Sequence, residues 1–284
     1  MRKLTRRNLL RLALASGSAG VAATAGLLYS RRVEPYQLVV ERIEARPAGM
    51  PREFDGLRLG LMSDLHRGPY ASEAFIERAA EALMSLSPDL IALTGDFVHG
   101  YNLQGPSVAR ALRALHAPLG IFAVMGNHDH WLDHKAIERA LRRQFADRSF
   151  EVLRNARVRL EARGAPLHIV GVDDVMVGRD DLERALADMP AGQPAILLAH
   201  EPDFADTASQ RYPFLLQMSG HSHGGQVRLP FVGAPILPPL GQKYPIGLQR
   251  AGNMLVYTSR GLGMIYPPVR FMCPPEVTLI TLRA

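Results

Sequence analysis

Short apolar segments recur along the chain from about residue 35 to the C-terminus, and turn-forming residues follow them. Segments of this length that are rich in Leu, Ile and Val are typical of β-strands, and those without polar positions are typical of strands covered on both faces. The pattern predicts nine strands, at Gln37–Ile43, Leu57–Ser63, Leu90–Thr94, Ile121–Met125, Leu167–Val172, Ile196–Ala199, Phe214–Met218, Met254–Thr258 and Val277–Leu282.

Amphipathic segments lie between these strands. Ser72, Asp133 and Asp180 are expected to be N-caps, because their side-chain oxygens can accept a hydrogen bond from the first helical turn. The pattern predicts four helices, at Ser72–Ser85, Ser107–Leu115, Asp133–Phe145 and from Asp180 to the residue before Pro190. Strands that alternate with helices predict an α/β fold.

Two stretches near the C-terminus, residues 230–250 and 264–275, do not follow this alternation. Both are apolar but interrupted by prolines, as in Phe231–Leu240 and Ile265–Pro268, so they are predicted to be loops. The sequence contains no low-complexity segment and no boundary that would divide residues 33–284 into two domains.

The formal charge of +6 belongs to the N-terminal segment. Residues 1–32 contain seven basic and no acidic side chains, whereas residues 33–284 contain 26 basic and 27 acidic ones. Because the remainder is nearly neutral and has no basic stripe with aromatic residues, a nucleic-acid partner is not expected.

The N-terminal segment resembles a twin-arginine export signal. Arg6 and Arg7 precede the uncharged run Leu12–Tyr29, which is rich in Ala, Gly and Leu. Ala23–Ala25 offers a cleavage site, but the run is also about as long as the shortest membrane-spanning helices. The chain is therefore expected to use the twin-arginine export machinery and to lie in the periplasm or on the outer face of the cytoplasmic membrane. Residues 1–32 are a cleaved signal or a membrane anchor (residues 9–30), and residues 33–284 the folded domain.

Metal-binding side chains follow five of the predicted strands. Asp64 and His66 come after Leu57–Ser63 and are two residues apart, so in an extended chain they point the same way and can reach one ion. The other candidates follow four further strands: Asp96, Asn127 and His200 come after one strand each, and His221 and His223 come after the same one. In α/β sheets ligands bind at the carboxyl ends of strands, so these positions can converge although they span about 160 residues.

The motifs differ in specificity. Asp-x-His, Gly-Asp and a single histidine at a strand end are common in surface turns and structural roles. Gly126–Asp129 (Gly-Asn-His-Asp) and Gly220–Gly225 (Gly-His-Ser-His-Gly-Gly) have few structural uses. The whole set in this order, each member after a strand, favours a metal site. The single cysteine, Cys273, excludes an intramolecular disulfide and a multi-cysteine zinc site.

The order of these motifs is similar to that of the calcineurin-like metallophosphoesterases. Gly220–Gln226 resembles a membrane-associated branch related to bacterial phosphodiesterases of the cell envelope, and Lys243–Gly247, Ser259–Gly263 and Cys273–Glu276 fit as well. The resemblance covers the chain from about residue 55 to its end. It implies a four-layer αββα sandwich, in which two mixed β-sheets are flanked by helices.

The resemblance also implies roles for individual residues. One metal ion would be held by Asp64, His66 and His223, and the other by Asn127, His200 and His221. Asp96 would bridge the two ions. His128 would not be a ligand; it would lie over the phosphate and stabilise charge or protonate the leaving oxygen.

The ligand types agree with this chemistry. Imidazole and carboxylate ligands suit two divalent or trivalent ions of Mn, Fe or Zn. Two such ions lower the pKa of a bridging water, and the resulting hydroxide would attack phosphorus in line, so no protein nucleophile is required. The metals and His128 would stabilise the charge on the phosphoryl oxygens.

Several functions fit this site. The first is an envelope phosphodiesterase or pyrophosphatase acting on a lipid-linked or nucleotide-linked phosphate at a membrane surface, because the apolar loops after His223 can form a lipid-facing rim. The branch includes a UDP-diacylglucosamine-type pyrophosphatase of lipid A synthesis, but that reaction needs a cytoplasm-facing site, which the export signal argues against. A phosphomonoesterase remains an alternative. A non-catalytic metal-binding module is disfavoured by the presence of His128, and the sequence has neither a G-x-S-x-G elbow nor a P-loop.

Some candidates have ordinary interpretations as well. The remaining histidines are expected to be structural or exposed: His99, His116, His130, His134 and His168. Of these, His99 and His130 lie close enough in sequence to the ligands to contact substrate. Arg67 and Arg260 can bind a phosphate with two hydrogen bonds each, or they can be solvated surface arginines.

Overall fold

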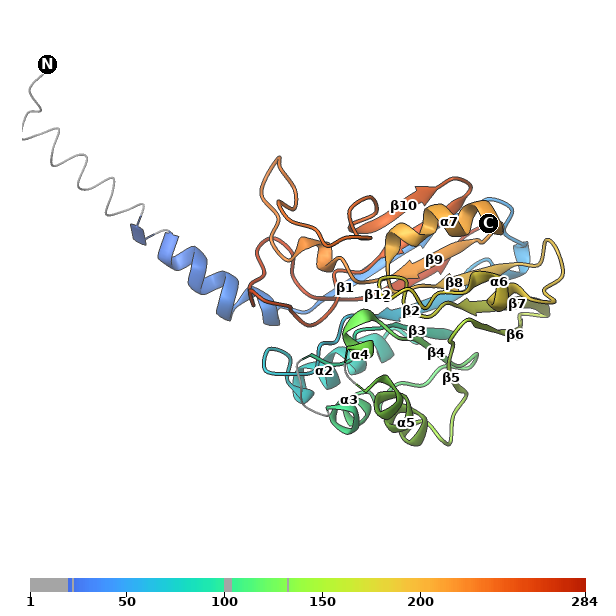
Figure 1. Cartoon of the computed structure of the whole chain (residues 1–284), viewed down its shortest axis with the longest axis horizontal. Coiled ribbons are helices and arrows are strands. Elements are labelled where there is room, and N and C mark those ends of the chain that lie inside the picture. Colours follow the sequence, from blue (N-terminus) through green and yellow to red (C-terminus); the bar gives the residue numbers. More distant parts are fainter. Residues whose placement is uncertain (1–19, 22, 100–103, 132) are drawn as a thin grey trace, which may run out of the picture.

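Two β-sheets stacked face to face form the centre of the molecule (Figure 1). The computed structural model describes residues 20–21, 23–99, 104–131 and 133–284. Within them, the first sheet has the strand order β1 (Val39–Ala45), β12 (Glu276–Leu282), β2 (Arg58–Met62), β3 (Leu90–Thr94), β4 (Ile121–Val124) and β5 (Phe150–Val152). The second has the order β10 (Gly247–Ala251), β11 (Met254–Thr258), β9 (Leu216–Ser219), β8 (Ala195–Leu198), β7 (Ala165–Gly171) and β6 (Ala156–Ala162).

Both sheets are mixed, with parallel strands at their centres. In the first sheet β2, β3, β4 and β5 are parallel, and β12 pairs antiparallel with β2. In the second sheet β7, β8, β9 and β11 are parallel, and the edge strands β6 and β10 are antiparallel to their neighbours. The parallel strands place several carboxyl ends at one edge of each sheet, which is where ligands bind in such sheets.

Alternate residues of the central strands face different cores. Leu90 and Ala92 of β3 pack between the sheets, against residues such as Ile196 of β8. Ile91 and Leu93 face the other way, toward the helices. Because both faces are covered, β4 and β8 are apolar at every position and β3 is apolar from Leu90 to Leu93, as the sequence pattern indicated.

Helices cover the outer face of each sheet and complete four layers (Figure 1). The first sheet is covered by α2 (Glu73–Met84), α3 (Gly105–Ala111) and α5 (His134–Gln144). The second is covered by α6 (Leu182–Leu186) and α7 (Ala205–Arg211). The predicted αββα sandwich is confirmed.

Two of the three predicted helix caps are confirmed. Ser72 Oγ accepts a hydrogen bond from the Phe75 amide (3.1 Å), and Asp133 Oδ1 accepts one from the Ala136 amide (3.0 Å). The third was wrong by one residue, because Asp181 rather than Asp180 caps α6, which is only one and a half turns long.

The sequence pattern missed several elements. The edge strand β6 alternates charged and apolar residues and is partly exposed, and β5 is only three residues long. Strand β10 corrects part of the predicted loop at residues 230–250, because Gly247–Ala251 pairs antiparallel with β11 although it lacks an apolar run. Helix α7 and the short α4 (Asn127–His130) were also not predicted.

The N-terminal segment is helical where it is described, at residues 20–21 and 23–32. Its end is joined to the body because the Arg270 amide donates a hydrogen bond to the Ser30 carbonyl (2.9 Å). Among the described residues, no helix has the length and apolarity needed to cross a membrane. The Arg6–Arg7 pair and the first part of the predicted signal, residues 1–19, lie outside the described residues.

Candidate metal centre

The seven predicted ligands lie at the carboxyl ends of strands from both sheets. Strands β2, β3 and β4 lead into the loops or the helix that carry Asp64, His66, Asp96 and Asn127, and β8 and β9 lead into His200, His221 and His223. All seven side chains are buried. The sheets face each other, so the two sets of loops meet.

Asp64, His66 and His223 form one cluster, in which one nitrogen or oxygen atom of each side chain lies within 4.8 Å of the others. His66 Nε2 and His223 Nε2 are 3.0 Å apart, and His223 Nε2 is 3.5 Å from Asp64 Oδ1. These donors belong to loops that are 157 residues apart in sequence. The structure therefore brings together the three side chains that the sequence assigned to one ion.

Asp64, Asp96 and His200 form a second cluster beside the first. Asp96 Oδ2 lies 3.3 Å from His200 Nε2 and 3.4 Å from His66 Nε2, so it contacts a histidine of each cluster. This is the position that a bridging carboxylate needs. Asp64 also belongs to both clusters, but its Oδ1 is farther from His200 Nε2, at 4.0 Å.

Asn127 and His221 are the remaining members of the predicted set; His221 lies next to His200, and Asn127 precedes His128, whose amide binds Asp96. The His221 and His200 rings are 5.1 Å apart. His221 Nε2 lies 2.8 Å from the Pro239 carbonyl, and this hydrogen bond leaves Nδ1 as the ring atom available to a metal. Asn127 Oδ1 is buried and accepts no hydrogen bond from any residue in the described part of the chain.

The donor set fits bound metal cations. The Nε2 atoms of His66 and His223 face each other at 3.0 Å, and Asn127 Oδ1 is buried with no hydrogen-bond partner among the described residues. Both arrangements cost free energy unless these atoms bind a positive ion. Four imidazoles, two carboxylates and an amide oxygen are ligands that suit Mn, Fe or Zn. The residues present therefore match the metal dependence that the sequence predicted.

Burial and mutual charge set the protonation of the centre. Burial raises the pKa of Asp64 to about 6 and lowers the pKa values of His66 and His223 well below the usual histidine range, so these rings are neutral, as metal ligands must be. Burial would also lower the pKa of His200, but the Asp96 and Asp64 carboxylates outweigh it and raise that pKa well above its usual value. The two carboxylates thus favour a positive charge at the position of His200.

Five of the seven candidate ligands have left-handed backbone conformations. Positive φ angles between 42° and 66° occur at Asp64, His66, Asp96, His221 and His223. Non-glycine residues rarely adopt them, and such strain gathers at functional sites where the surrounding structure maintains it. The backbone therefore turns sharply at these positions, directly after the strand ends.

Glycines allow the ligand loops to approach one another. A Cβ atom on Gly220 would lie 1.9 Å from Ser63 Oγ and 2.1 Å from Asp64 Oδ2. One on Gly126 would lie 2.3 Å from Asp96 Oδ1. Contacts of this length do not occur, so the two glycines of the specific motifs are required by packing against Asp64 and Asp96.

His128 lies at the accessible side of the centre. Its amide donates a hydrogen bond to Asp96 Oδ1 (2.9 Å), and its ring packs edge-on against His66, with 4.7 Å between centroids. His99 stacks on His128 at 5.3 Å and also lies against His66. His99, expected from sequence to be structural or a substrate contact, therefore belongs to the cluster around His128.

Asp129 holds two ligand loops together, a role that sequence reasoning did not assign. Its Oδ1 accepts a hydrogen bond from the Phe97 amide (2.9 Å), and its Oδ2 accepts one from the Gly126 amide (3.0 Å). These bonds join the loop after β3 to the loop after β4. Burial raises the pKa of Asp129 to about 8. The signal was present in the sequence, because Asp129 ends the Gly-Asn-His-Asp motif.

The two arginines considered for phosphate binding are occupied elsewhere. Arg67 Nε donates to Ser107 Oγ (2.8 Å), and the Arg260 guanidinium forms ion pairs with Glu276 and Glu41. Arg260 therefore braces strands β12 and β1. The structure gives no support to the interpretation of either arginine as a phosphate clamp.

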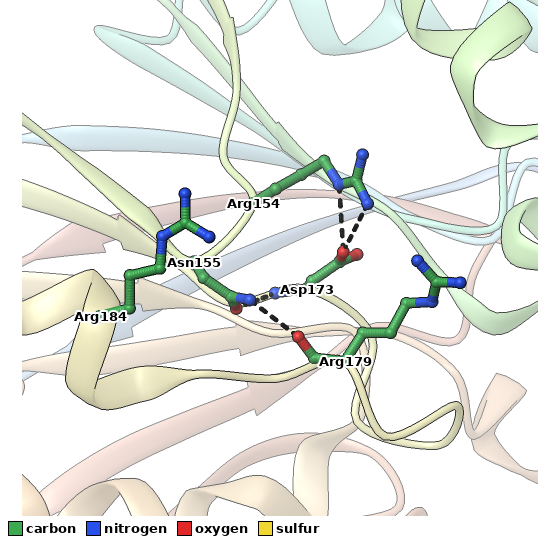
Figure 2. A pocket seen from close by; sticks show the side chains of 5 residues that line it. All are labelled: Arg154, Asn155, Asp173, Arg179 and Arg184. Atoms are coloured by element: carbon green, nitrogen blue, oxygen red, sulfur yellow. Dashed lines mark hydrogen bonds and ion pairs between the residues drawn. The ribbon is translucent and has the colours of Figure 1, made fainter.

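His130 binds Asp173, which is one of the residues that line a basic pocket of about 420 Å³ (Figure 2). Its Nε2 lies 2.7 Å from Asp173 Oδ1, and Arg154 donates two hydrogen bonds to Asp173 Oδ2. Arg179 and Arg184 line the same pocket (Figure 2). Here His130 is a structural residue that ties α4 to the second sheet.

Arg270 fixes a C-terminal loop against the centre. It is fully buried, and its Nη2 donates to the carbonyls of Gly263 (2.6 Å) and Arg260 (2.9 Å). Gly261 and Gly263 pack against Asp64 and His66, where a Cβ atom would lie 2.6 Å and 2.5 Å from their respective Cβ atoms. This loop, unlike the strand ends, carries no ligand signature in the sequence.

The geometry agrees with the sequence relatives of the chain. Residues 57–225, more than half of the chain, match the family model described as calcineurin-like phosphoesterase. An uncharacterized metallophosphoesterase of Bacillus subtilis, YkuE, is 35% identical over 100% of this chain and 99% of its own length.

Two further relatives have more specific names. The UDP-2,3-diacylglucosamine pyrophosphatase LpxG of Chlamydia trachomatis is 30% identical, and the match covers 89% of this chain and 92% of LpxG. The phosphodiesterase YaeI of Escherichia coli is 29% identical, covering 95% of this chain and 97% of YaeI.

Proposed function

The chain belongs to the calcineurin-like phosphoesterase family, and from this premise we propose that it is a dinuclear-metal phosphodiesterase. Its substrate would contain a phosphodiester or pyrophosphate bond in a lipid-linked or nucleotide-linked molecule of the cell envelope. The observation that carries the proposal is the clustering of Asp64, His66, Asp96, His200 and His223, with His128 at their accessible side. The names of YaeI and LpxG support a diester or a pyrophosphate as the bond that is cleaved.

The side chains divide into two sets of metal ligands. In this proposal Asp64, His66 and His223 hold one ion, Asn127, His200 and His221 hold the other, and Asp96 bridges them. Bound Mn, Fe or Zn ions would polarise the phosphoryl oxygens and supply hydroxide near neutral pH. Burial lowers the pKa of both His66 and His223, which favours the neutral imidazole that a metal ligand needs.

His128 acts on the substrate rather than on the metals. Its backbone is fixed by the hydrogen bond to Asp96, and its ring is only partly buried. Neither Nδ1 nor Nε2 of His128 has a hydrogen-bond partner within the residues that the structure describes. One of these nitrogens can therefore donate a hydrogen bond to a phosphoryl oxygen or a proton to the leaving oxygen.

A substrate screen tests the proposal. The purified full chain with Mn²⁺ would be assayed on bis-p-nitrophenyl phosphate, on p-nitrophenyl phosphate and on a UDP-linked pyrophosphate ester. We expect hydrolysis of the diester or the pyrophosphate, and a loss of about 1,000-fold in Asp96→Asn, because the proposed bridging ligand is weakened. Asp206→Asn is the control, since Asp206 is a surface carboxylate bound to Lys243.

Two results would contradict it. Activity that is unchanged in Asp96→Asn would exclude the metal centre as the catalyst. Hydrolysis of the monoester alone would favour the phosphomonoesterase alternative. Cleavage of the pyrophosphate in preference to the diester would place the activity closer to that for which LpxG is named.

We further propose that residues 1–32 are a twin-arginine signal or anchor that places the domain of residues 33–284 outside the cytoplasmic membrane. The proposal rests on Arg6 and Arg7 before an uncharged run. Cell fractionation tests it: changing both arginines to lysine is expected to retain the protein in the cytoplasm. Normal export of that variant would exclude the twin-arginine route.

A further inference from the structure

Exposed apolar side chains gather on two loops next to the metal centre. Fourteen large hydrophobic residues are exposed among the described residues, and six of them belong to the loops of residues 227–240 and 264–273. The six are Leu229, Phe231, Val232, Ile236, Tyr266 and Met272. Single exposed apolar residues are common, but a concentration of this kind indicates a binding surface.

The two loops, called here the apolar loops, enclose a groove of about 470 Å³. Its walls come from segments such as Pro235–Pro239 and Ile265–Pro267, and its inner end is formed by Ser222 and His223. Because His223 is also a candidate metal ligand, the groove borders the metal centre. A volume of this size accommodates part of a small ligand.

Hydrogen bonds hold the apolar loops in place. The Gln226 side chain donates to the carbonyls of Ile265 (3.3 Å) and Pro267 (3.2 Å), and it accepts from the Ile265 amide (2.8 Å). The backbones of Arg228 and Phe271 are also joined, by a bond of 2.8 Å. The exposed side chains are thus presented by a braced surface.

The N-terminal helix leaves the body beside these loops (Figure 1). The Arg270 amide binds the Ser30 carbonyl, and the Cys273 amide donates to Glu34 Oε1 (2.5 Å). Six more of the exposed large hydrophobic residues lie in this segment: Val21, Leu27, Leu28, Tyr29, Val33 and Tyr36. In Figure 1 the blue helix and the orange and red loops lie at the same end of the molecule.

Basic side chains accompany the apolar ones. Arg31 and Arg32 are exposed at the base of the helix, and Arg228 lies within the first apolar loop. None of the three forms an ion pair with another residue in the part of the chain that the structure describes, although Arg228 Nη1 donates a hydrogen bond to the Gly224 carbonyl (3.0 Å). Apolar residues that insert and arginines that remain free to meet anionic headgroups are the combination that lipid surfaces attract.

We propose that the apolar loops dock on an anionic lipid bilayer and that the groove between them receives the alkyl chain of a phosphoester lipid drawn from that bilayer. The alkyl chain lies along the groove and the phosphate reaches the His223 end. This inference rests on the proposed function, because it supplies that activity with a substrate class and a direction of approach. The bilayer explains three features together: the apolar loops, the apolar helix beside them and the unpaired arginines.

Chain-length dependence tests the groove. Methyl and hexyl p-nitrophenyl phosphodiesters would be compared with the full chain and Mn²⁺. Each buried methylene contributes up to about fourfold, so kcat/KM of the hexyl ester should exceed that of the methyl ester at least about tenfold. The ratio should fall below about threefold in the double variant Ile236→Ser/Tyr266→Ser, and persist in Met176→Ser, an exposed methionine outside the loops. An unchanged ratio in the double variant would overturn the groove.

Quenching of tryptophan fluorescence by brominated lipid tests the docking surface independently of enzymatic activity. The variants Phe231→Trp and Met176→Trp would be mixed with phosphatidylglycerol vesicles whose acyl chains are brominated, with the unmodified chain as the baseline for Trp131. We expect quenching of Phe231→Trp well above the baseline and none for Met176→Trp. Equal quenching in both variants, or none in either, would overturn the docking surface.

The two experiments separate the two proposals. If neither ester is hydrolysed, nor the UDP-linked pyrophosphate of the substrate screen, the proposed function fails, and calorimetric binding of hexylphosphonate against methylphosphonate then decides the groove. Preference for hexylphosphonate that the double variant loses would support the groove, and equal affinity would overturn it. If both esters are hydrolysed at equal rates and Phe231→Trp is not quenched, the proposed function stands and the lipid inference fails.

Discussion

The metal centre and the apolar loops are opposite exceptions to the usual distribution of residues in a folded protein. The centre buries carboxylates, imidazoles and an amide, whereas the loops a short distance away expose Phe231, Ile236 and Tyr266. A buried polar group and an exposed apolar patch are the two departures that carry functional information. The two regions meet at His223, which is both a candidate ligand and the end of the groove.

The regions also differ in how they are built. The centre depends on strained backbone at Asp64, Asp96 and His221, and on glycines with no room for a side chain. The apolar loops are braced by Gln226 and Arg270, whose hydrogen bonds end on backbone carbonyls. The centre should therefore be intolerant of nearly every change, while the loops should tolerate changes that preserve the bracing.

The largest effect is expected at Asp96. If Asp96 bridges two ions, Asp96→Ala should lose most of both, whereas His223→Ala should lose about one of the two. Metal analysis of the purified variants measures this directly. Loss of both ions in His223→Ala, with one retained in Asp96→Ala, would contradict the assignment and favour Asp64 as the bridge, since Asp64 belongs to both clusters.

The next largest effect is expected at Gly220. A methyl group there would collide with Ser63 and Asp64, so Gly220→Ala should lower the free energy of unfolding by about 1–3 kcal/mol and weaken metal binding. Gly26→Ala is the control, because no atom lies within 4 Å of a Cβ at that position. Denaturant titration and metal analysis of both variants test this, and a native-like Gly220→Ala would show that the loops are less tightly packed than inferred.

Metal removal should have an effect of similar size on the whole protein. A ligand that binds only the folded state at 1,000 times its Kd stabilises by about 4 kcal/mol. Chelation should therefore lower the unfolding temperature, and Mn²⁺ should restore it. In Asp96→Ala the chelator should have little effect, because little metal is left to remove. A chelator effect of the same size in that variant would place the stabilising metal elsewhere.

The sequence predicted the candidate ligands and the fold. The strand ends and the seven candidate ligands were readable because a strand covered on both faces has no polar residue until it ends, so Asp64, Asp96 and His200 stand out. The αββα fold followed from the family resemblance and the alternation of strands and helices. The role of Asp129 was not predicted, although its place in the specific Gly-Asn-His-Asp motif indicated that it has one.

Other parts could not be predicted, for physical reasons. Strand β10 depends on pairing with β11, and its own residues carry no apolar run. The environment of Arg270 is tertiary, because its partners are carbonyls that the fold assembles around it. The sequence marked Phe231–Leu240 as an apolar loop, but only the structure showed that it and the loop of residues 264–273 enclose a groove ending at His223.

The smallest effect is expected in the apolar loops. Phe231 is fully exposed, so Phe231→Ser should change the free energy of unfolding by less than about 0.5 kcal/mol. Phe122, buried between the sheets, provides the contrast, because Phe122→Ala should cost about 3–5 kcal/mol. Denaturant titration of the two variants separates an apolar residue that stabilises the fold from one that is kept for a partner. A large loss of stability in Phe231→Ser would mean that the loop packs against the body in solution, and its exposure could then no longer support a docking surface.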